Sequence, residues 1–255
     1  MEKDHVLSSV NNAIKILRSF KMETPQKGVR ELAAELGLGK SSVQRILATL
    51  AKEGLVRKNS ETNKYELGLS VLELSSIVLG HIDLHKEALP IITKLANTFK
   101  ETSHLAILDN LEIIYLCKVE SENSIKLVSH PGLHNHTHST SSGKLLLAYS
   151  EPFLVDTILD KGLERFTSKT ITDPIEFRRE LKQICQKGYS VSNGELRDAV
   201  TSLSAPVRDY TGKVMAAINL VGPSNRLTQR KVEWMASELI RSGELISEKM
   251  GYWKR

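Results

Sequence analysis

The chain has only two cysteines, Cys117 and Cys185, and they form no C-x-x-C pair. This excludes a disulfide framework and is typical of a protein from a reducing compartment. Long apolar runs are also missing. Glu73 and three serines interrupt the stretch 67–82, and a membrane-spanning helix needs about 20 consecutive apolar residues. The opening residues carry charges of both signs and do not resemble a secretory signal peptide. We therefore expect a soluble, cytoplasmic protein.

Signatures of nucleotide and serine chemistry are absent as well. The sequence contains no G-x-G-x-x-G, P-loop or G-x-S-x-G pattern, so neither a nucleotide cofactor nor a serine hydrolase is indicated. The remaining composition, 40% apolar and 25% charged over 255 residues, is ordinary for a globular chain of one large or two modest domains. We expect no cofactor and no enzymatic activity.

The positive charge is concentrated in one segment. The net charge is only +5, but residues 40–64 hold six basic side chains against two acidic ones. A local basic cluster of this kind is expected of a protein that binds a phosphate backbone. A solvated lysine-rich face would look the same, so the pattern of the surrounding residues has to decide.

That pattern predicts a winged helix-turn-helix. Apolar residues recur at helical spacing in 8–22, 29–36 and 40–53, and glycines at 37 and 39 permit a tight turn between the last two helices. Two short strands, 55–58 and 64–67, would follow as a hairpin. Helix-turn-helix units also serve as protein-interaction modules, but these basic residues favour DNA. The residues expected to meet DNA are Lys40, Ser41, Ser42, Gln44, Arg45, Thr49, Arg57, Lys58 and Lys64.

We expect some of these residues to contact bases and others to contact phosphates. Gln44 and Arg45 are the candidates for base edges, because Gln pairs with adenine and Arg with guanine in the major groove. Arg57, Lys58 and Lys64 would hold phosphates, contacts that fix position without reading sequence.

A family resemblance covers nearly the whole chain. The run GVRELAAELGLGKSSVQRILATL (28–50) closely resembles the DNA-binding segment of IclR-family bacterial transcriptional regulators. Further segments resemble the family in the same order: KYELG (64–68), ETSHLAILD (101–109), HSTSSGKLLLA (138–148), KGY (187–189), APVRD (205–209) and VGP (221–223). The resemblance implies a winged helix at 1–68, a linker helix at 69–83 and, at 84–255, a GAF-like α/β effector-binding domain.

The linker has the pattern of a helix that pairs with another helix. Leu67, Val71, Leu74 and Val78 follow one another at spacings of 4, 3 and 4, the apolar seam of a coiled coil. Dimerisation is favoured, because two recognition helices on one face of a duplex need a symmetric partner. The resemblance also implies a homodimer or tetramer. The alternative is a helix that packs on its own winged helix.

The remaining pattern predicts an α+β domain with a largely antiparallel sheet. Helices are expected at 84–100, 140–149, 152–160, 174–187 and from 229 onward, and strands at 103–108, 113–119, 125–128, 190–192, 203–208 and 214–221.

Four of the eight histidines lie within 130–138, and their spacing raises the question of a metal site. No spaced cysteine or carboxylate completes a ligand set, and an exposed histidine-rich loop is the commoner outcome, so we assign no metal. The competing hypothesis is a metal-dependent hydrolase fused to a DNA-targeting domain, in which His136 and His138 would be required.

The resemblance also implies where an effector binds. In relatives that bind small oxo-acids, the positions of the pocket correspond here to Ser141 and Ser142 before a helix start at Gly143, then Ser192, Ser202, Asn219 and Val221. A carboxylate, a cysteine and two serines of the family pattern are replaced at the later positions. We therefore expect a different ligand, a small hydroxyl-bearing carboxylate. Its acid group would lie at the helix start, its hydroxyls toward Ser202 and Asn219, with Leu105 and Val221 on the apolar side. The alternative is that these serines only fill turns and strands. Repression relieved by this ligand is the expected regulation.

Overall fold

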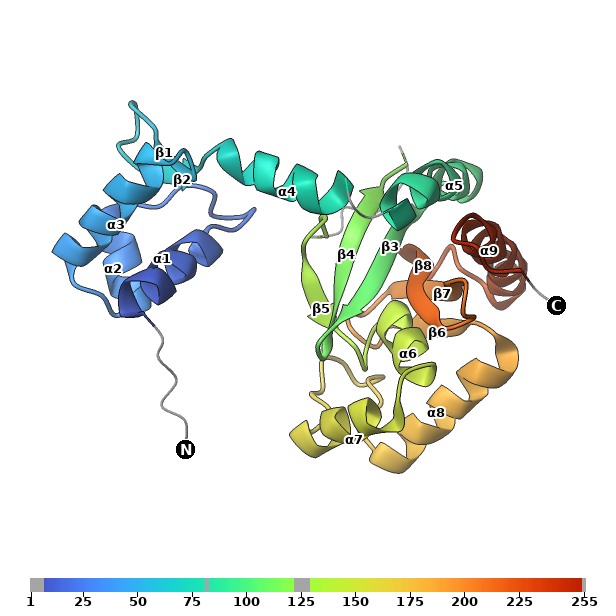
Figure 1. Ribbon diagram of the computed structural model, residues 1–255. Coiled ribbons are helices and arrows are strands. Elements are labelled where there is room, and N and C mark those ends of the chain that lie inside the picture. The colour runs from blue at the N-terminus through green and yellow to red at the C-terminus, as the bar shows by residue number, and fades with distance from the viewer. Residues whose placement is uncertain (1–6, 81–82, 122–128, 254–255) are drawn as a thin grey trace. The chain divides into compact units, whose positions relative to one another are not determined.

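The computed structural model describes residues 7–80, 83–121 and 129–253. The chain forms two compact units, Met1–His81 and Ile82–Arg255 (Figure 1). Each unit has its own buried apolar core. The expected strand at 125–128 lies outside the described residues.

The first unit is a winged helix-turn-helix, as the sequence predicts. Its elements are α1 (Ser8–Ser19), α2 (Val29–Leu36), α3 (Lys40–Lys52) and the antiparallel strands β1 (Val56–Lys58) and β2 (Tyr65–Leu67). Leu32 of α2 and Val43 and Leu47 of α3 are fully buried together in its core. α2 ends at Gly37, whose φ of 65° is a backbone conformation that glycine adopts without strain.

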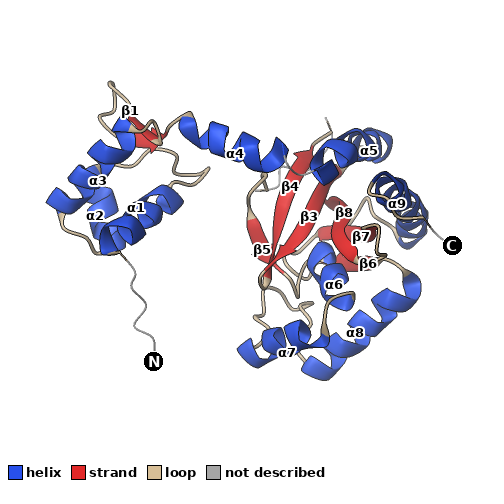
Figure 2. Cartoon of the chain, in the orientation of Figure 1, coloured by secondary structure: helices blue, strands red, loops and turns tan. Residues whose placement is uncertain are grey.

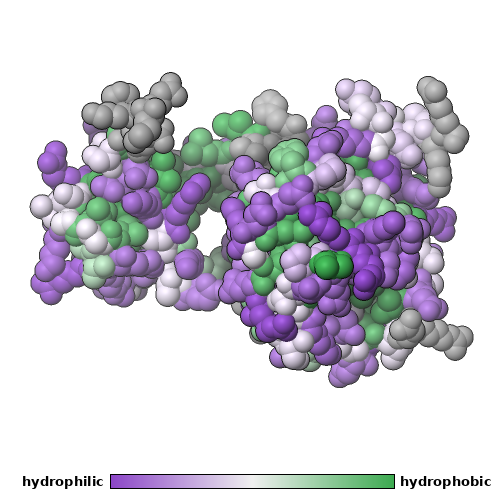
Figure 3. Space-filling view, turned by 90° about the horizontal axis from the view of Figure 1, so that it is seen from below, coloured by the Kyte–Doolittle hydropathy of each residue, from purple (hydrophilic) through white to green (hydrophobic). Residues whose placement is uncertain are grey.

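The helix α4 (Ser70–Gly80) belongs to this unit and leaves its large side chains uncovered. Leu72, Leu74 and Ile77 are 65%, 56% and 59% exposed. Figure 3 shows green, hydrophobic residues at the surface of the segment that carries α4. The side chain of Val78 lies outside the described residues. Several large apolar side chains exposed on one helix indicate a surface that another chain or element covers.

The second unit is built on a six-stranded antiparallel sheet of order β5-β4-β3-β8-β7-β6, which confirms the predicted fold class. Its elements are α5 (Asp83–Phe99), β3 (Thr102–Asp109), β4 (Glu112–Val119), β5 (His134–His136), α6 (Ser141–Ala148), α7 (Pro152–Lys161), α8 (Pro174–Lys187), β6 (Ser190–Asn193), β7 (Val200–Arg208), β8 (Val214–Pro223) and α9 (Gln229–Lys249). Local signals set several of these bounds. α8, for example, begins after Asp173, whose carboxylate accepts the N–H of Glu176, and ends at Gly188.

Helices cover the two faces of the sheet separately (Figure 2). α5 and α9 pack on one face, where Leu105 of β3 is fully buried. α6, α7 and α8 pack on the other face, around Ala106 of the same strand. Because neighbouring residues of a strand point to opposite faces, His104 shares the face of Ala106. The buried polar side chain of His104 therefore lies on the α6 side of the sheet.

The histidine-rich segment differs from its expected loop. His134–His136 forms the edge strand β5, which pairs with β4 so that His136 lies opposite Glu112. Three polar residues in a row give no apolar alternation, so the backbone pairing that makes them a strand cannot be recognised in the sequence.

Candidate functional site

The outer face of α3 presents the residues expected to meet DNA. Val43, Leu47 and Leu50 are buried against the rest of the winged helix, so the opposite face is turned to solvent. The exposed residues there are Lys40, Ser41, Ser42, Gln44, Arg45 and Thr49. These six side chains make the solvent-facing side of α3 polar and basic. The major groove of DNA is wide enough to admit such a helix.

Carboxylates hold two of the three basic side chains of the hairpin. Arg57 Nε lies 2.5 Å from Glu66 Oε1, and Lys64 Nζ lies 2.8 Å from Glu31 Oε1. The pKa of the Glu66 carboxyl is lowered chiefly by a hydrogen bond from Gln26, and that of Glu31 chiefly by a hydrogen bond from Lys64. Both carboxyls therefore stay ionised. Lys58 is exposed and has no carboxylate partner among the described residues. The hairpin therefore offers less free positive charge than its sequence indicates.

A cavity of about 300 Å³ lies on the α6 side of the sheet in the second unit. Strand register places its polar floor: His104 pairs with Asn219, and Val221 pairs with Ser202, which pairs in turn with Ser192. These residues come from four adjacent strands and point to one face because each side chain sits at an alternate position of its strand. These strand residues therefore border one cavity.

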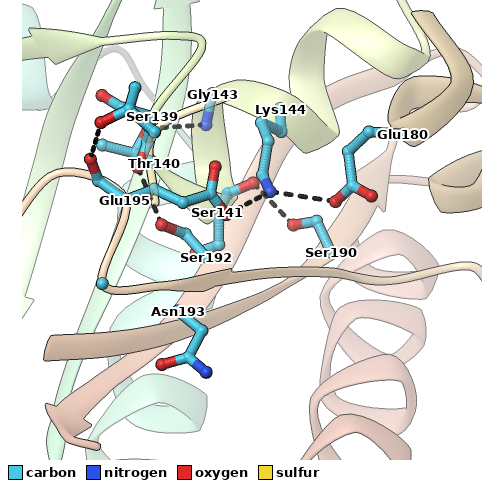
Figure 4. Close-up of polar contacts among 12 residues, drawn as sticks. Ser139, Thr140, Ser141, Gly143, Lys144, Glu180, Ser190, Ser192, Asn193 and Glu195 are labelled. Carbon is cyan, nitrogen blue, oxygen red and sulfur yellow. Dashed lines mark hydrogen bonds and ion pairs between the residues drawn. The ribbon is translucent and has the colours of Figure 1, made fainter. Parts of the chain in front are cut away.

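The start of α6 closes one side of this cavity. Thr140 caps the helix, because its Oγ1 accepts the N–H of Gly143 at 3.1 Å (Figure 4). The hydroxyls of Ser141 and Ser142 both lie within hydrogen-bonding distance of Ser204 Oγ, at 2.7 and 3.1 Å. The helix start is thus fastened to the sheet by its own serines.

The structure brings five of the eight expected effector residues together around the cavity: Ser141, Ser192, Ser202, Asn219 and Val221. Three others lie elsewhere. Leu105 points into the core on the α5 side of the sheet. Ser142 is turned toward Asn219, whose Nδ2 donates to Ser142 Oγ at 2.9 Å. Gly143 is packed so closely on Thr137 that a Cβ there would lie 2.3 Å from its backbone, and its N–H is already used by the cap.

His104 is a cavity residue that the sequence analysis did not single out. Its backbone N–H and its ring Nδ1 both lie within 3.0 Å of Asn219 Oδ1, and its Nε2 lies 2.9 Å from Ser129 Oγ. Because Asn219 Oδ1 accepts, Nδ1 carries the proton and Nε2 accepts from the serine. Burial lowers the pKa of His104 from 6.5 to about 4, so the ring is neutral at physiological pH. Side chains alternate between the two faces of β3, so the placement of Leu105 on the apolar face would have predicted that His104 lies on the opposite face.

A buried lysine lies beside the helix start. Lys144 of α6 is 1% exposed, and its Nζ lies 2.6 Å from Glu195 Oε1 and 2.9 Å from Glu180 Oε1. These two carboxylates reach it from the loop after β6 and from α8 (Figure 4). Burial raises the pKa of Glu195, and the lysine opposes that shift. α6 is therefore bound to the loop after β6 (the cavity loop) by this ion pair, and to the sheet by its serines.

The histidines near β5 are engaged by other groups. His138 Nε2 lies 2.8 Å from the carbonyl oxygen of Glu164, and the His136 ring packs on Phe166 at 4.5 Å between centroids. Within residues 7–80, 83–121 and 129–253, no three His, Cys, Asp or Glu side chains are placed to hold one metal ion. In the same ranges no helix is long and apolar enough to cross a membrane.

Family models match both units in chain order. The IclR helix-turn-helix domain matches residues 9–60, and the model described as bacterial transcriptional regulator IclR C-terminal matches residues 76–248. The chain belongs to the IclR family. It is therefore a DNA-binding transcriptional regulator, with the winged helix as its DNA-binding domain.

Individual relatives of this IclR-family chain match over nearly its full length. The HTH-type transcriptional regulator KdgR of Escherichia coli is 32% identical over 248 residues, 96% of this chain and 94% of the relative. The IclR structure from Thermotoga maritima is 29% identical, covers 96% of this chain and 99% of that one, and has a TM-score of 0.80. An IclR homolog from Microbacterium hydrocarbonoxydans, complexed with 4-hydroxybenzoate, shares the fold at 24% identity and a TM-score of 0.87, covering 95% and 99% of the two chains. KdgR is named as a transcriptional regulator, which indicates a regulatory role for this chain.

Proposed function

We propose that this chain represses transcription by binding an operator, and that a small hydroxyl-bearing carboxylate in the cavity of the second unit relieves repression. The observation that carries the proposal is the composition of the cavity wall. The wall has five serine hydroxyls and the start of α6, and no carboxylate among the described residues that line it. Such a wall suits an anion with hydroxyl groups, because helix N-termini and neutral donors both favour negative charge. 4-Hydroxybenzoate, which the Microbacterium homolog holds, belongs to this chemical class.

The placement of the cavity residues changes how such a ligand would lie. Asn219 already uses its oxygen for His104 and its nitrogen for Ser142. A ligand hydroxyl is therefore better served by Ser202 and by the pair of Ser129 and His104, which line the same cavity. Val221 remains on the apolar side.

A thermal-shift screen of acidic, neutral and basic metabolites tests the proposal. Hydroxycarboxylates should raise the melting temperature of the second unit, since a ligand that binds only the folded state stabilises it. Ser202→Glu should abolish this shift by placing a negative charge in the wall, whereas Ser202→Gln, of similar size and neutral, should retain part of it. Stabilisation by uncharged or cationic compounds alone would contradict the proposal.

On the DNA side, we propose that Arg45 reads a base edge and that Lys58 holds a phosphate. Duplexes selected from a random pool supply the operator. Arg45→Ala should weaken binding to the selected duplex by about 1 to 3 kcal/mol and reduce selectivity, whereas Lys58→Ala should weaken all sequences alike. Equal losses of Arg45→Ala on selected and random DNA, at fixed salt, would contradict base readout.

We propose that the working form is a homodimer, or a tetramer built from dimers, in the cytoplasm where bacterial DNA lies. Leu74 and Ile77 of α4 support this, because both are exposed and lie three residues apart on one side of the helix, where a second copy would cover them. The ligand would stabilise one state of the second unit. α4 would then change the separation of two recognition helices away from one turn of DNA, about 34 Å.

A further inference from the structure

One full positive charge borders the cavity. Arg197 lies in the loop between β6 and β7 and lines the cavity with its neighbour Leu196 and with Val200. Its side chain is exposed, and no ion pair to it is found among the described residues. Because the described part of the wall holds no carboxylate, this guanidinium has no counter-ion inside the cavity.

A buried hydroxyl on the same wall also lacks a partner. Ser139 lines the cavity and is 0% exposed, and its Oγ makes no hydrogen bond with any described residue. Its neighbour Thr140 uses its own hydroxyl for the cap of α6 and for the carbonyl of His136, and Ser192 donates to the backbone carbonyl of Ser139. Buried hydroxyls are nearly always satisfied, so an unpartnered hydroxyl on a residue of the cavity wall is a candidate hydrogen-bond donor to a ligand.

The loop that carries Arg197 is held in place from both sides. Two residues before the arginine, the Glu195 carboxylate pairs with the buried Lys144, and the Glu195 carbonyl accepts the hydroxyl of Thr170 at 2.6 Å (Figure 4). Lys144 lies on α6, whose first turn borders the cavity beside Ser139. The arginine and the free hydroxyl are thus carried by segments tied to each other through one buried ion pair.

We propose that Arg197 and Ser139 form the carboxylate-binding end of the effector cavity, and that Arg197 makes the regulator select an anion over its neutral analogue. This rests on the effector proposed above and deepens it. The planar guanidinium can donate two parallel hydrogen bonds to a carboxylate, and the serine hydroxyl can donate a third. The neutral His104 at the other end of the floor accepts from Ser129 and adds no positive charge of its own.

The test compares small hydroxycarboxylates with their primary amides, 4-hydroxybenzoate and 4-hydroxybenzamide among them, by calorimetric titration of the full chain. For carboxylates, Arg197→Gln should raise the Kd by at least about tenfold and Ser139→Ala by about threefold, as loss of a charge-assisted and of a single hydrogen bond predicts. Amide binding should hardly change. Arg179→Gln removes the same charge from an exposed site on α8 outside the cavity and should leave every Kd unchanged.

Two failures can be told apart. If carboxylates bind Arg197→Gln as tightly as they bind the natural protein and Arg179→Gln, the role of Arg197 is overturned and the effector cavity stands. If amides and other neutral compounds bind the natural protein and carboxylates do not, the anionic effector itself is overturned. An unchanged Kd for carboxylates in Ser139→Ala, together with a raised Kd in Arg197→Gln, supports the arginine and overturns the part assigned to the serine.

Discussion

His104 is a single side chain whose protonation is tied to folding. It is fully buried with a pKa of about 4, against 6.5 when exposed. The folded state therefore binds this proton less readily than the unfolded state. The stabilisation is complete above pH 6.5 and is lost as the pH falls toward 4, at about 1.4 kcal/mol for each unit.

We expect the second unit to lose about 2 kcal/mol of stability through His104 between pH 7 and pH 5. His104→Gln keeps a polar side chain but cannot titrate, so its loss over this range should be smaller by that amount. Calorimetric unfolding of both proteins at the two pH values measures the difference. Equal losses would show that the ring is not held neutral by burial.

Two glutamates of the winged helix restrain its basic side chains. Glu66 and Glu31 hold Arg57 and Lys64, which the sequence alone assigns to phosphates. A phosphate must compete with these carboxylates before the hairpin contributes its full charge, so the acidic residues set part of the affinity for DNA.

Glu66→Gln should release Arg57 and raise affinity for random duplex DNA several-fold. The slope of log K against log salt should become steeper by about 0.9, the value for one added phosphate contact. Glu53→Gln makes the same change of charge at the exposed end of α3, where no carboxylate partner of a hairpin residue is removed, and should alter the slope much less. An identical slope in the two variants would mean that Arg57 does not reach DNA.

α6 is a short helix that carries a buried charged residue, Lys144, near its centre. Its leucines pack under α7 and α8, its first turn borders the cavity, and Lys144 joins it to the cavity loop. A buried ion pair seldom adds much stability over an apolar pair, but removing one partner leaves the other charge uncompensated.

Lys144→Met should therefore destabilise the second unit by about 3 to 5 kcal/mol. The double variant Lys144→Met with Glu195→Leu should recover part of that loss, since it removes a buried carboxylate along with the lysine. Lys182→Met, at an exposed position of α8, should change stability by less than about 0.5 kcal/mol. Urea unfolding of the three variants measures these effects, and a double variant no more stable than Lys144→Met would contradict the pairing.

For the whole molecule, the proposed regulation requires that two copies of the chain act together. α4 leaves Leu72, Leu74 and Ile77 exposed on the first unit, and a symmetric partner would bury them. Dimerisation would also set two α3 helices against one face of the duplex, which a single copy cannot do.

Leu74→Glu should give a folded monomer with weak operator binding, because the fold of one chain does not bury Leu74 but a symmetric contact would bury two like charges. Ser75→Glu places the same charge at the next position of α4 and should leave the dimer intact if it points away from the contact. Sedimentation measures the oligomeric state of both variants, and titration with operator DNA measures their affinity. A Leu74→Glu protein that remains dimeric and binds DNA normally would exclude α4 as the contact.

The sequence by itself determined the elements of the winged helix and most of those of the second unit. Helical spacing, the glycine at 37 and the proline that opens α8 are local signals, and they act within a few residues of themselves. The ordered family motifs added the order of the two domains and the set of residues proposed to bind an effector. Five of the eight expected cavity residues line the cavity, and four of these lie on the neighbouring strands β6, β7 and β8.

Only the tertiary structure decided which side chains meet. His104 and Asn219 are 115 residues apart, Lys144 and Glu195 are 51 apart, and Arg57 faces Glu66 across a hairpin. Such pairs depend on strand register and on which face each strand turns to its neighbours, and one residue of shift would reverse every face. The same dependence sent Leu105 to the apolar core, left Ser139 without a partner and brought Arg197 to the cavity, because long-range pairing of strands has no local signature.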